Sequence, residues 1–391
     1  MANQNIGTKR TDEAMEFSWS EEDQAFRDRL RGVIEGALPP KWQDMIPGEE
    51  ATSAFTVEFS EMLAAQGLLT PHWPSEYGGR DASGWQFIIL GEELWSAGEP
   101  RGSQYMNVNW VGPAIMIAGT QEQKDYHLKR IAAGNVLWCQ GFSELGAGTD
   151  LAAMTTSASR DGDEYVINGE KVWTSYARGA EFCFLLARTD PRAGRDQGVS
   201  VFLVPTDTPG LTIEPYRSDL DIHEFNRMTF DSVRVPASAL LGEENQGWQV
   251  IKRALAHERI GGPRYQRALV VARRLERIAR ERRWWERDGV RTRYVAAEAA
   301  CQAARLLVYQ AIDAREKNLP DDLAVSLARV AIVRSERLVA ELAMELLGDE
   351  SLARDSIGNT QFKTSMIAGL GGGSVEVQLN TVARALLGPG R

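Results

Sequence analysis

Glu258 is the residue of this chain that is best suited to act as a general base. It stands in the run Leu-Ala-His-Glu-Arg at residues 255–259, inside a stretch whose apolar spacing predicts a helix over 248–282. At helical periodicity it shares a face with apolar or small residues and with no lysine or arginine, namely Ile251, Ala254, Leu255, Gly261 and Gly262. A carboxylate on an inward face without a cationic partner has a raised pKa, which suits proton abstraction. The alternative is a Glu on a charged surface, or one paired with a residue of another element.

A glycine-rich turn is the second feature that could do chemistry. Residues 142–150 read Phe-Ser-Glu-Leu-Gly-Ala-Gly-Thr-Asp after a predicted strand. Free backbone N–H groups and hydroxyls in such a turn can hold a phosphate or the edge of a flavin. The run is not a hydrolase elbow, because Leu145 stands where that motif needs its last glycine. It is not a dinucleotide fingerprint either, because Leu151 replaces the third glycine. A plain turn stays open as the alternative.

The composition limits the classes of function. The chain has 391 residues, of which 43% are hydrophobic and 25% charged, as in ordinary globular proteins. Its net charge of −10 argues against a nucleic-acid binder, and four histidines without ligand spacing argue against a metal site. No apolar run approaches the length of a membrane span. The polar N-terminus and three widely spaced cysteines favour a reducing cytoplasm.

Three segments with different residue patterns must position these groups, and together they predict an α+β fold. Residues 1–135 show amphipathic periodicity and predict an N-terminal α-helical domain. Residues 136–240 hold short β-branched and aromatic runs separated by turn signals such as Asp161-Gly162-Asp163 and Asn168-Gly169, which predict an antiparallel β-barrel domain. Residues 241–391 predict a C-terminal four-helix bundle. The expected helices are 21–38, 55–66, 85–97, 121–133, 248–282, 290–317, 321–347 and 373–387.

Several motifs, in order along the whole chain, resemble those of the acyl-CoA dehydrogenase family. The glycine-rich turn is followed by Asn-Gly-Glu-Lys-Val-Trp-Thr-Ser at 168–175. The pair is similar to the family's two flavin-contacting segments, Thr-Glu-Pro-Gly-Ala-Gly-Ser-Asp and Gly-x-Lys-x-Trp-x-[Ser/Thr]. Further matches lie at 74–79, 119–124, 233–236, 241–243 and 371–380. The order of helices, β domain and long helices also resembles the plan of that family.

The resemblance implies FAD as the cofactor and an acyl-CoA thioester as the substrate. By that resemblance Ser143 would bond the pyrimidine end of the isoalloxazine, and Thr149 would bond the pyrophosphate. Trp173 would pack against the flavin ring, and Thr174 would reach toward its N5 edge. The other residues that we expect at the cofactor are Phe142, Gly148 and Ser175. Electrons would pass to an electron-transfer flavoprotein.

The C-terminal motif lacks the base that many family members carry there. Their signature reads Tyr-Glu-Gly-Thr-Ser-Glu-Ile-Gln-Arg-Asn, whereas this chain has Gly372 at the position of the first Glu. In the isovaleryl-type branch the base lies instead on the first bundle helix, in a Leu-x-x-Glu-Arg context that matches Glu258. Arg259 matches an arginine beside the C-terminal loop, so we expect it to support the site. Gly371, Gly372 and Gly373 would widen the site for a bulky, branched or cyclic acyl group, or simply form the turn that leads into the last helix.

Within the family the likeness is greatest to bacterial dehydrogenases of steroid side-chain and ring degradation, which often form α₂β₂ heterotetramers. The family's Arg-x-x-Phe-Gly segment, which reaches a neighbouring subunit's FAD, has no match between Arg280 and Arg293. We therefore expect an acyl-CoA dehydrogenase that works as a homotetramer or homodimer, or beside a homologous subunit. Two alternatives stay open: a non-catalytic or co-catalytic subunit of a heteromeric dehydrogenase, and a flavin oxidase or monooxygenase on the same fold.

Overall fold

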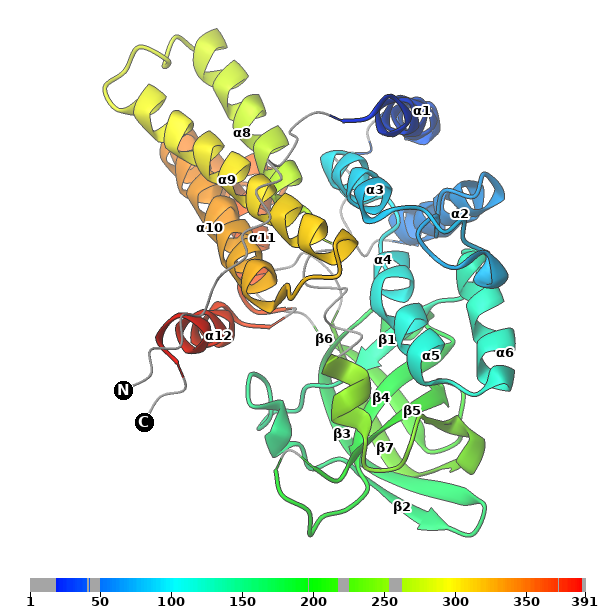
Figure 1. The fold of residues 1–391 in the computed structure, drawn as a ribbon. Coiled ribbons are helices and arrows are strands. Elements are labelled where there is room, and N and C mark those ends of the chain that lie inside the picture. Colours follow the sequence, from blue (N-terminus) through cyan, green and yellow to red (C-terminus); the bar gives the residue numbers. More distant parts are fainter. Residues whose placement is uncertain are drawn as a thin grey trace, which may run out of the picture.

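The computed structural model describes residues 19–40, 42, 50–195, 197–216, 225–252, 262–371 and 373–388. Helices come first along the chain, a sheet follows, and longer helices end it (Figure 1). The N-terminal helices pack against the sheet through one apolar cluster and against the bundle through another. This is the α+β arrangement predicted from the sequence.

Local signals explain most of the N-terminal helices. They are α1 (Glu21–Ala37), α2 (Glu50–Ala65), α3 (Gly84–Ser96), α4 (Gln104–Met106), α5 (Gly112–Ala118) and α6 (Gln121–Ala132), with the short 3-10 helix η2 (Ser75–Tyr77) and the π-helical turn η3 (Asn107–Val111). The side chains of Ser20 and Thr120 cap α1 and α6 by accepting backbone N–H bonds. The four N-terminal helices predicted from periodicity are confirmed, whereas α4, η3 and α5 were not predicted.

The β domain is a sheet of eight strands within the described residues. They are β1 (Trp138–Gly141), β2 (Ser157–Asp161), β3 (Glu164–Ser175), β4 (Phe182–Arg188), β5 (Val199–Pro205), β6 (Leu211–Tyr216), β7 (Phe225–Pro236) and β8 (Leu240–Leu241), with 3-10 turns η4 (Leu151–Ala153), η5 (Ala177–Gly179) and η6 (Ala237–Ala239). The order is β6-β7-β3-β2-β4-β5-β8, and β1 pairs with β4. Most pairs are antiparallel, but β1 and β2 both run parallel to β4.

Asn168 and Gly169 lie inside β3 rather than at the hairpin turn that they predicted. The strand continues through them because both of its halves pair with β7, across an irregularity at which Gly169 has a φ of +143°. A Cβ at Gly169 would lie 2.6 Å from the Cα of Thr156, so the glycine permits a close approach of two backbones. The other predicted turn is confirmed, because Asp161 pairs with Glu164 and closes the β2–β3 hairpin.

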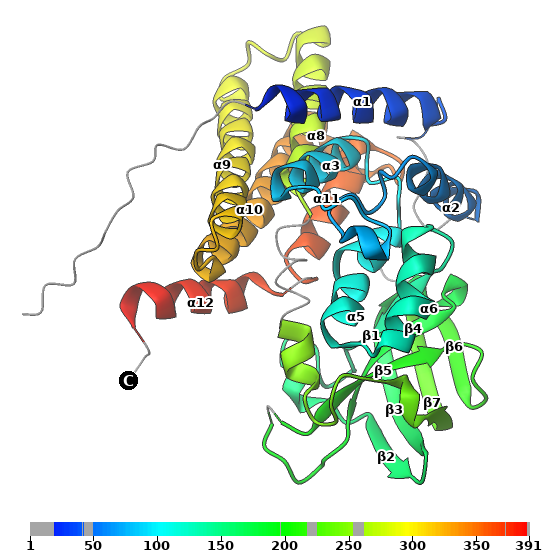
Figure 2. The same ribbon diagram turned by 45° about the vertical axis from the view of Figure 1, so that its right-hand side comes forward.

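The C-terminal bundle is built around α10. Its helices are α8 (Arg264–Glu281), α9 (Val290–Glu316), α10 (Asp322–Leu347), α11 (Ile357–Ala368) and α12 (Val375–Leu387), with the 3-10 turn η7 (Gly348–Leu352) between α10 and α11. Helix α10 packs against the other four, and α12 runs across the end of the bundle (Figure 2). The sequence predicted one helix over 248–282. Residues 247–252 are helical, residues 253–261 lie outside the described part of the chain, and α8 begins at Arg264. Gly262 and Pro263 are not helical, because proline has no N–H to donate and its ring obstructs a preceding helical turn.

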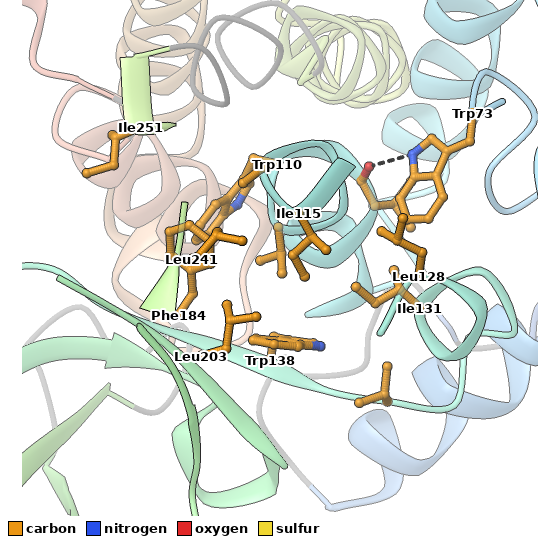
Figure 3. Packing of buried hydrophobic residues seen from close by; sticks show 14 of the residues in the cluster. Trp73, Trp110, Ile115, Leu128, Ile131, Trp138, Phe184, Leu203, Leu241 and Ile251 are labelled. Atoms are coloured by element: carbon orange, nitrogen blue, oxygen red, sulfur yellow. Dashed lines mark hydrogen bonds between the residues drawn. The ribbon is translucent and has the colours of Figure 1, made fainter. Parts of the chain in front are cut away.

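An apolar cluster holds the N-terminal helices on the sheet. Figure 3 shows its rings and branched side chains, which come from both domains and include Trp73, Trp110, Ile115, Leu128, Trp138, Phe184 and Leu203. The indole of Trp73 donates to the carbonyl of Val108 at 3.1 Å, so its polar atom is satisfied in the core. Among the residues that the structure describes, none of the helices combines the length and the apolar character needed to cross a membrane.

Candidate functional site

The glycine-rich turn at 142–150 presents its backbone to open space. It closes on itself through two hydrogen bonds, in which the N–H of Glu144 donates to the carbonyl of Ala147 at 3.0 Å and the reverse bond measures 3.1 Å. A Cβ added at Gly146 or Gly148 would meet no described atom within 4 Å, and Leu145 is 76% exposed. A ligand could therefore approach the backbone at Gly146 and Gly148 without displacing a side chain of the described residues.

A buried ion pair lies beneath the turn. The ammonium of Lys171, which is fully buried, donates to Glu144 Oε1 at 2.8 Å and to the carbonyl of Phe142 at 3.0 Å. The carboxylate of Glu144 also accepts from Thr155 and Thr156. Burial by itself would raise the pKa of Glu144, but the charge of Lys171 and these hydrogen bonds outweigh burial and lower that pKa to about 2. The carboxylate is therefore ionised at neutral pH.

A bulge in β3 pushes Trp173 out of the sheet. Lys171 pairs with Met228 and Thr174 with Asn226, so two residues of β3 face a single residue of β7. Trp173 has a φ of +60° there, and its side chain is 54% exposed. Its N–H donates to the hydroxyl of Tyr216 at 2.8 Å. Bulges beside functional sites commonly aim a side chain in this way, and here the result is an exposed indole face.

The turn and the bulge are neighbours in space. The N–H of Val172 donates to the carbonyl of Ser143 at 2.8 Å, and Lys171 bonds Phe142 as described above. Phe142 is buried, and its ring packs against Trp110 of η3. Ser143 is half-buried, whereas Gly148 and Thr149 are exposed. The structure thus brings the two segments that the sequence singled out into direct contact.

Thr174 differs from its neighbours because its side chain is fully buried. Its hydroxyl has no hydrogen-bond partner among the described residues, and its carbonyl accepts from the amide of Asn226 at 3.0 Å. Ser175 is half-buried and follows Thr174 in the strand, so its side chain points to the opposite face of the sheet. The hydroxyl of Ser175 is therefore better placed than that of Thr174 to reach a ligand beside Trp173.

Glu258 and Arg259 lie outside the described residues, as does Gly372. The described glycines beside Gly372 differ in their constraints. Gly371 is exposed with no described atom within 4 Å of an added Cβ, whereas Gly373 has a φ of +91°. The guanidinium of Arg329 on α10 donates to the carbonyls of Ala368 and Gly371, which ties the start of this turn to the bundle.

Three residues at the site were not singled out from the sequence, namely Glu144, Lys171 and Tyr216. Glu144 lies in the glycine-rich turn, and Lys171 lies in the motif at 168–175. A lysine inside a predicted strand could have indicated a buried cation that needs a carboxylate partner. Tyr216 gave no signal, because only the pairing of β6 with β7 brings it beside Trp173. In the described part of the chain, no three His, Cys, Asp or Glu side chains gather closely enough to hold a metal ion.

Three family models match in chain order: acyl-CoA dehydrogenase, N-terminal domain, at 20–135; the middle domain at 139–233; and the C-terminal domain at 245–387. Acyl-CoA dehydrogenase IpdE1 of Mycobacterium tuberculosis is 33% identical over 376 residues, which cover 93% of this chain and 97% of that protein. Acyl-CoA dehydrogenase FadE26 of the same organism is 32% identical, with 96% and 98% covered.

Solved structures of two-protein assemblies are also similar to this chain. The Tcur3481-Tcur3483 steroid ACAD matches with a TM-score of 0.88 and 32% identity, covering 96% of this chain and 100% of that chain. The ChsE4-ChsE5 complex from Mycobacterium tuberculosis matches with a TM-score of 0.86 and 30% identity, again covering 96% and 100%.

Proposed function

Because this chain belongs to the acyl-CoA dehydrogenase family, whose members are oxidoreductases that act on CH–CH bonds, we propose that it is an FAD-dependent dehydrogenase. It would introduce a double bond between Cα and Cβ of an acyl-CoA thioester. The observation that carries the proposal is the contact between the open glycine-rich turn and the β3 bulge, through Val172 and Ser143. An open backbone beside an exposed indole is what a planar, phosphate-bearing cofactor needs.

The residues present fit FAD. Ser143, Gly148 and Thr149 offer a hydroxyl, an uncovered backbone and a second hydroxyl along one turn. Trp173 offers an exposed ring, and Ser175 replaces Thr174 in our proposal as the hydroxyl beside it. Phe142 supports the turn from below. When bound, FAD accepts the hydride that leaves Cβ of the substrate.

Glu258 is the proposed base that takes the α-proton, with Arg259 in support. The proposal rests on the Leu-Ala-His-Glu-Arg run and on Gly372 at the position where many relatives have their base. In stopped-flow experiments with a bulky acyl-CoA, Glu258→Gln should slow flavin reduction by about a hundredfold or more while FAD content stays unchanged. Glu276→Gln, which changes a half-buried carboxylate on α8 that pairs with Arg280, serves as the control. An unchanged rate in Glu258→Gln would refute the assignment of the base.

The proposed substrate carries a bulky, branched or cyclic acyl group. The open space at Gly371 supports this, because no described side chain occupies it. The steroid ACAD among the similar structures supports it further. Flavin reduction rates with butyryl-CoA and with a ring-bearing acyl-CoA would test it, and a preference for butyryl-CoA would refute it.

The proposed partners are a homologous subunit and an electron-transfer flavoprotein. Exposed apolar side chains on α11, on α12 and between the two helices support a subunit contact there: Phe362, Met366, Leu370, Leu379, Leu386 and Leu387. The two-protein assemblies among the similar structures favour a heteromer, in which this chain could be a non-catalytic subunit. The FAD content and mass of the chain purified alone show whether it needs a partner, and the activity of Glu258→Gln in the reconstituted complex distinguishes the two roles, because unchanged activity there would mark a non-catalytic subunit. The cytoplasmic location stays a prediction.

A further inference from the structure

We propose that Glu144 and Lys171 are positioning residues that fix the cofactor-facing turn in its binding conformation before FAD arrives. The inference rests on the proposed function, but it concerns two side chains that are buried beneath the turn. Lys171 is 0% exposed and Glu144 is 7% exposed, so neither presents its charge to the open side of the turn.

The pair joins three separate segments of the β domain. Lys171 comes from β3 and reaches the carbonyl of Phe142 at the start of the turn. Glu144 belongs to the turn itself and accepts from the backbone and the hydroxyl of Thr155, each at 2.7 Å. The N–H of Thr156 donates to its other oxygen at 2.9 Å. The carboxylate therefore clamps the chain on both sides of the glycine-rich turn, before Leu145 and after Leu151.

The other contacts of the turn are few: Glu144 and Ala147 exchange two backbone hydrogen bonds, the N–H of Val172 donates to the carbonyl of Ser143, and the side chain of Ala147 is buried. The side chain of Leu145 is exposed, and a Cβ added at Gly146 or Gly148 would meet no described atom within 4 Å. Two glycines within four residues also leave the backbone many alternative conformations. A turn that is ordered in advance loses less conformational entropy when it binds a ligand, so the clamp should contribute directly to FAD affinity.

The charges of the two side chains matter together. Removing one of them leaves the other buried without a counter-charge, which is strongly unfavourable, whereas removing both is tolerated better. An orphaned Lys171 would draw water or a new partner toward the carbonyl of Phe142, and the turn would shift with it. The single variants should therefore be worse than the double variant.

The test measures FAD affinity of the full-length protein, with its partner subunit if it has one, after the flavin has been removed and added back. Glu144→Gln and Lys171→Met should each weaken FAD binding by about tenfold or more, and Glu144→Gln/Lys171→Met should recover part of the loss. Amide exchange of the cofactor-free protein should be faster at residues 143–149 in both single variants, with the bundle helices unchanged.

Glu93→Gln is the matched control. Glu93 lies on α3, its side chain is 7% exposed, and it pairs with Arg27 and Arg31 far from the turn in sequence. This variant should lower thermal stability but change FAD affinity by no more than about twofold. The inference is overturned if Glu144→Gln binds FAD as tightly as the wild type, or if Glu93→Gln loses as much affinity. A wild-type protein that binds no FAD would overturn the proposed function. Wild-type protein that binds FAD, with Glu144→Gln binding it equally well, would overturn only the positioning role of Glu144 and Lys171.

Discussion

Replacing Glu92 with glutamine should destabilise the contact between the N-terminal helices and the bundle. Glu92 lies on α3 and is fully buried, and four side chains from three other helices donate to its carboxylate. The guanidinium of Arg27 on α1 donates to Glu92 Oε2 at 2.8 Å, and the hydroxyl of Tyr265 in the first turn of α8 donates to Glu92 Oε1 at 2.9 Å. From α9, the guanidinium of Arg305 and the hydroxyl of Tyr309 donate to Glu92 Oε1 at 3.1 and 2.8 Å. The carboxylate of Glu92 thus connects the N-terminal helices to the C-terminal bundle.

The magnitude follows from what the amide can replace. Glutamine keeps an acceptor oxygen but no charge, so the buried Arg27 would keep only Glu93 as a counter-charge, and the half-buried Arg305 would lose its pairing with Glu92. Breaking a buried ion pair by removing one partner costs about 3–5 kcal/mol, and the retained acceptor places this variant near 3 kcal/mol. The exposed Glu345, which pairs with Arg293 on the bundle surface, should change the free energy of unfolding by about 0–1 kcal/mol as Glu345→Gln.

Urea unfolding, followed by both far-ultraviolet circular dichroism and tryptophan fluorescence, measures these differences. A double-mutant cycle of Glu92→Gln with Tyr309→Phe should add a coupling energy of about 1.5 kcal/mol or more, because the hydroxyl donates to a charged acceptor. A loss below about 1 kcal/mol for Glu92→Gln, or a loss equal to that of Glu345→Gln, would refute the reasoning from burial.

Three further predictions concern titration and pocket size. The pKa of Glu144 is lowered to about 2 from an ordinary 4.5 by Lys171 and hydrogen bonds that outweigh burial, so its stabilising effect is complete above pH 4.5 and lost as the pH falls through about 2. The difference in unfolding free energy between wild type and Glu144→Gln should shrink over that range, and a constant difference would contradict the ion pair. Burial and Arg130 lower the pKa of His127 from 6.5 to about 4, so the folded protein should lose stability as the pH falls from 6.5 to 4, because the unfolded chain binds a proton that the buried imidazole does not. Its NMR resonance, assigned with His127→Phe, should titrate near pH 4, and an inflection near 6.5 would contradict its burial. Gly371→Tyr should fold, because an added Cβ has open space, and should lower kcat/KM for a ring-bearing acyl-CoA about tenfold relative to butyryl-CoA; equal effects on both substrates would place Gly371 away from the pocket.

The helices were predictable because their signals are local. Apolar spacing and capping residues such as Ser20 and Thr120 act within one or two turns, so α1, α3 and α6 lie where periodicity placed them. The strands were less predictable. β2 is largely polar and β8 has two residues, and each exists because a neighbouring strand pairs with it. Asn168-Gly169 was wrong as a turn for the same reason, because pairing with β7 overrides a local preference.

The sequence by itself determined the family, the two segments proposed to face the cofactor and the position of the candidate base, because residue types in a fixed order carry that information. The tertiary structure alone decided that Trp173 is exposed while Thr174 is buried, since a bulge depends on a strand more than fifty residues away. It also decided that Lys171 meets Glu144 and that Tyr216 meets Trp173. Such contacts join residues that are distant in the chain, and only the pairing of strands sets which side chains face each other.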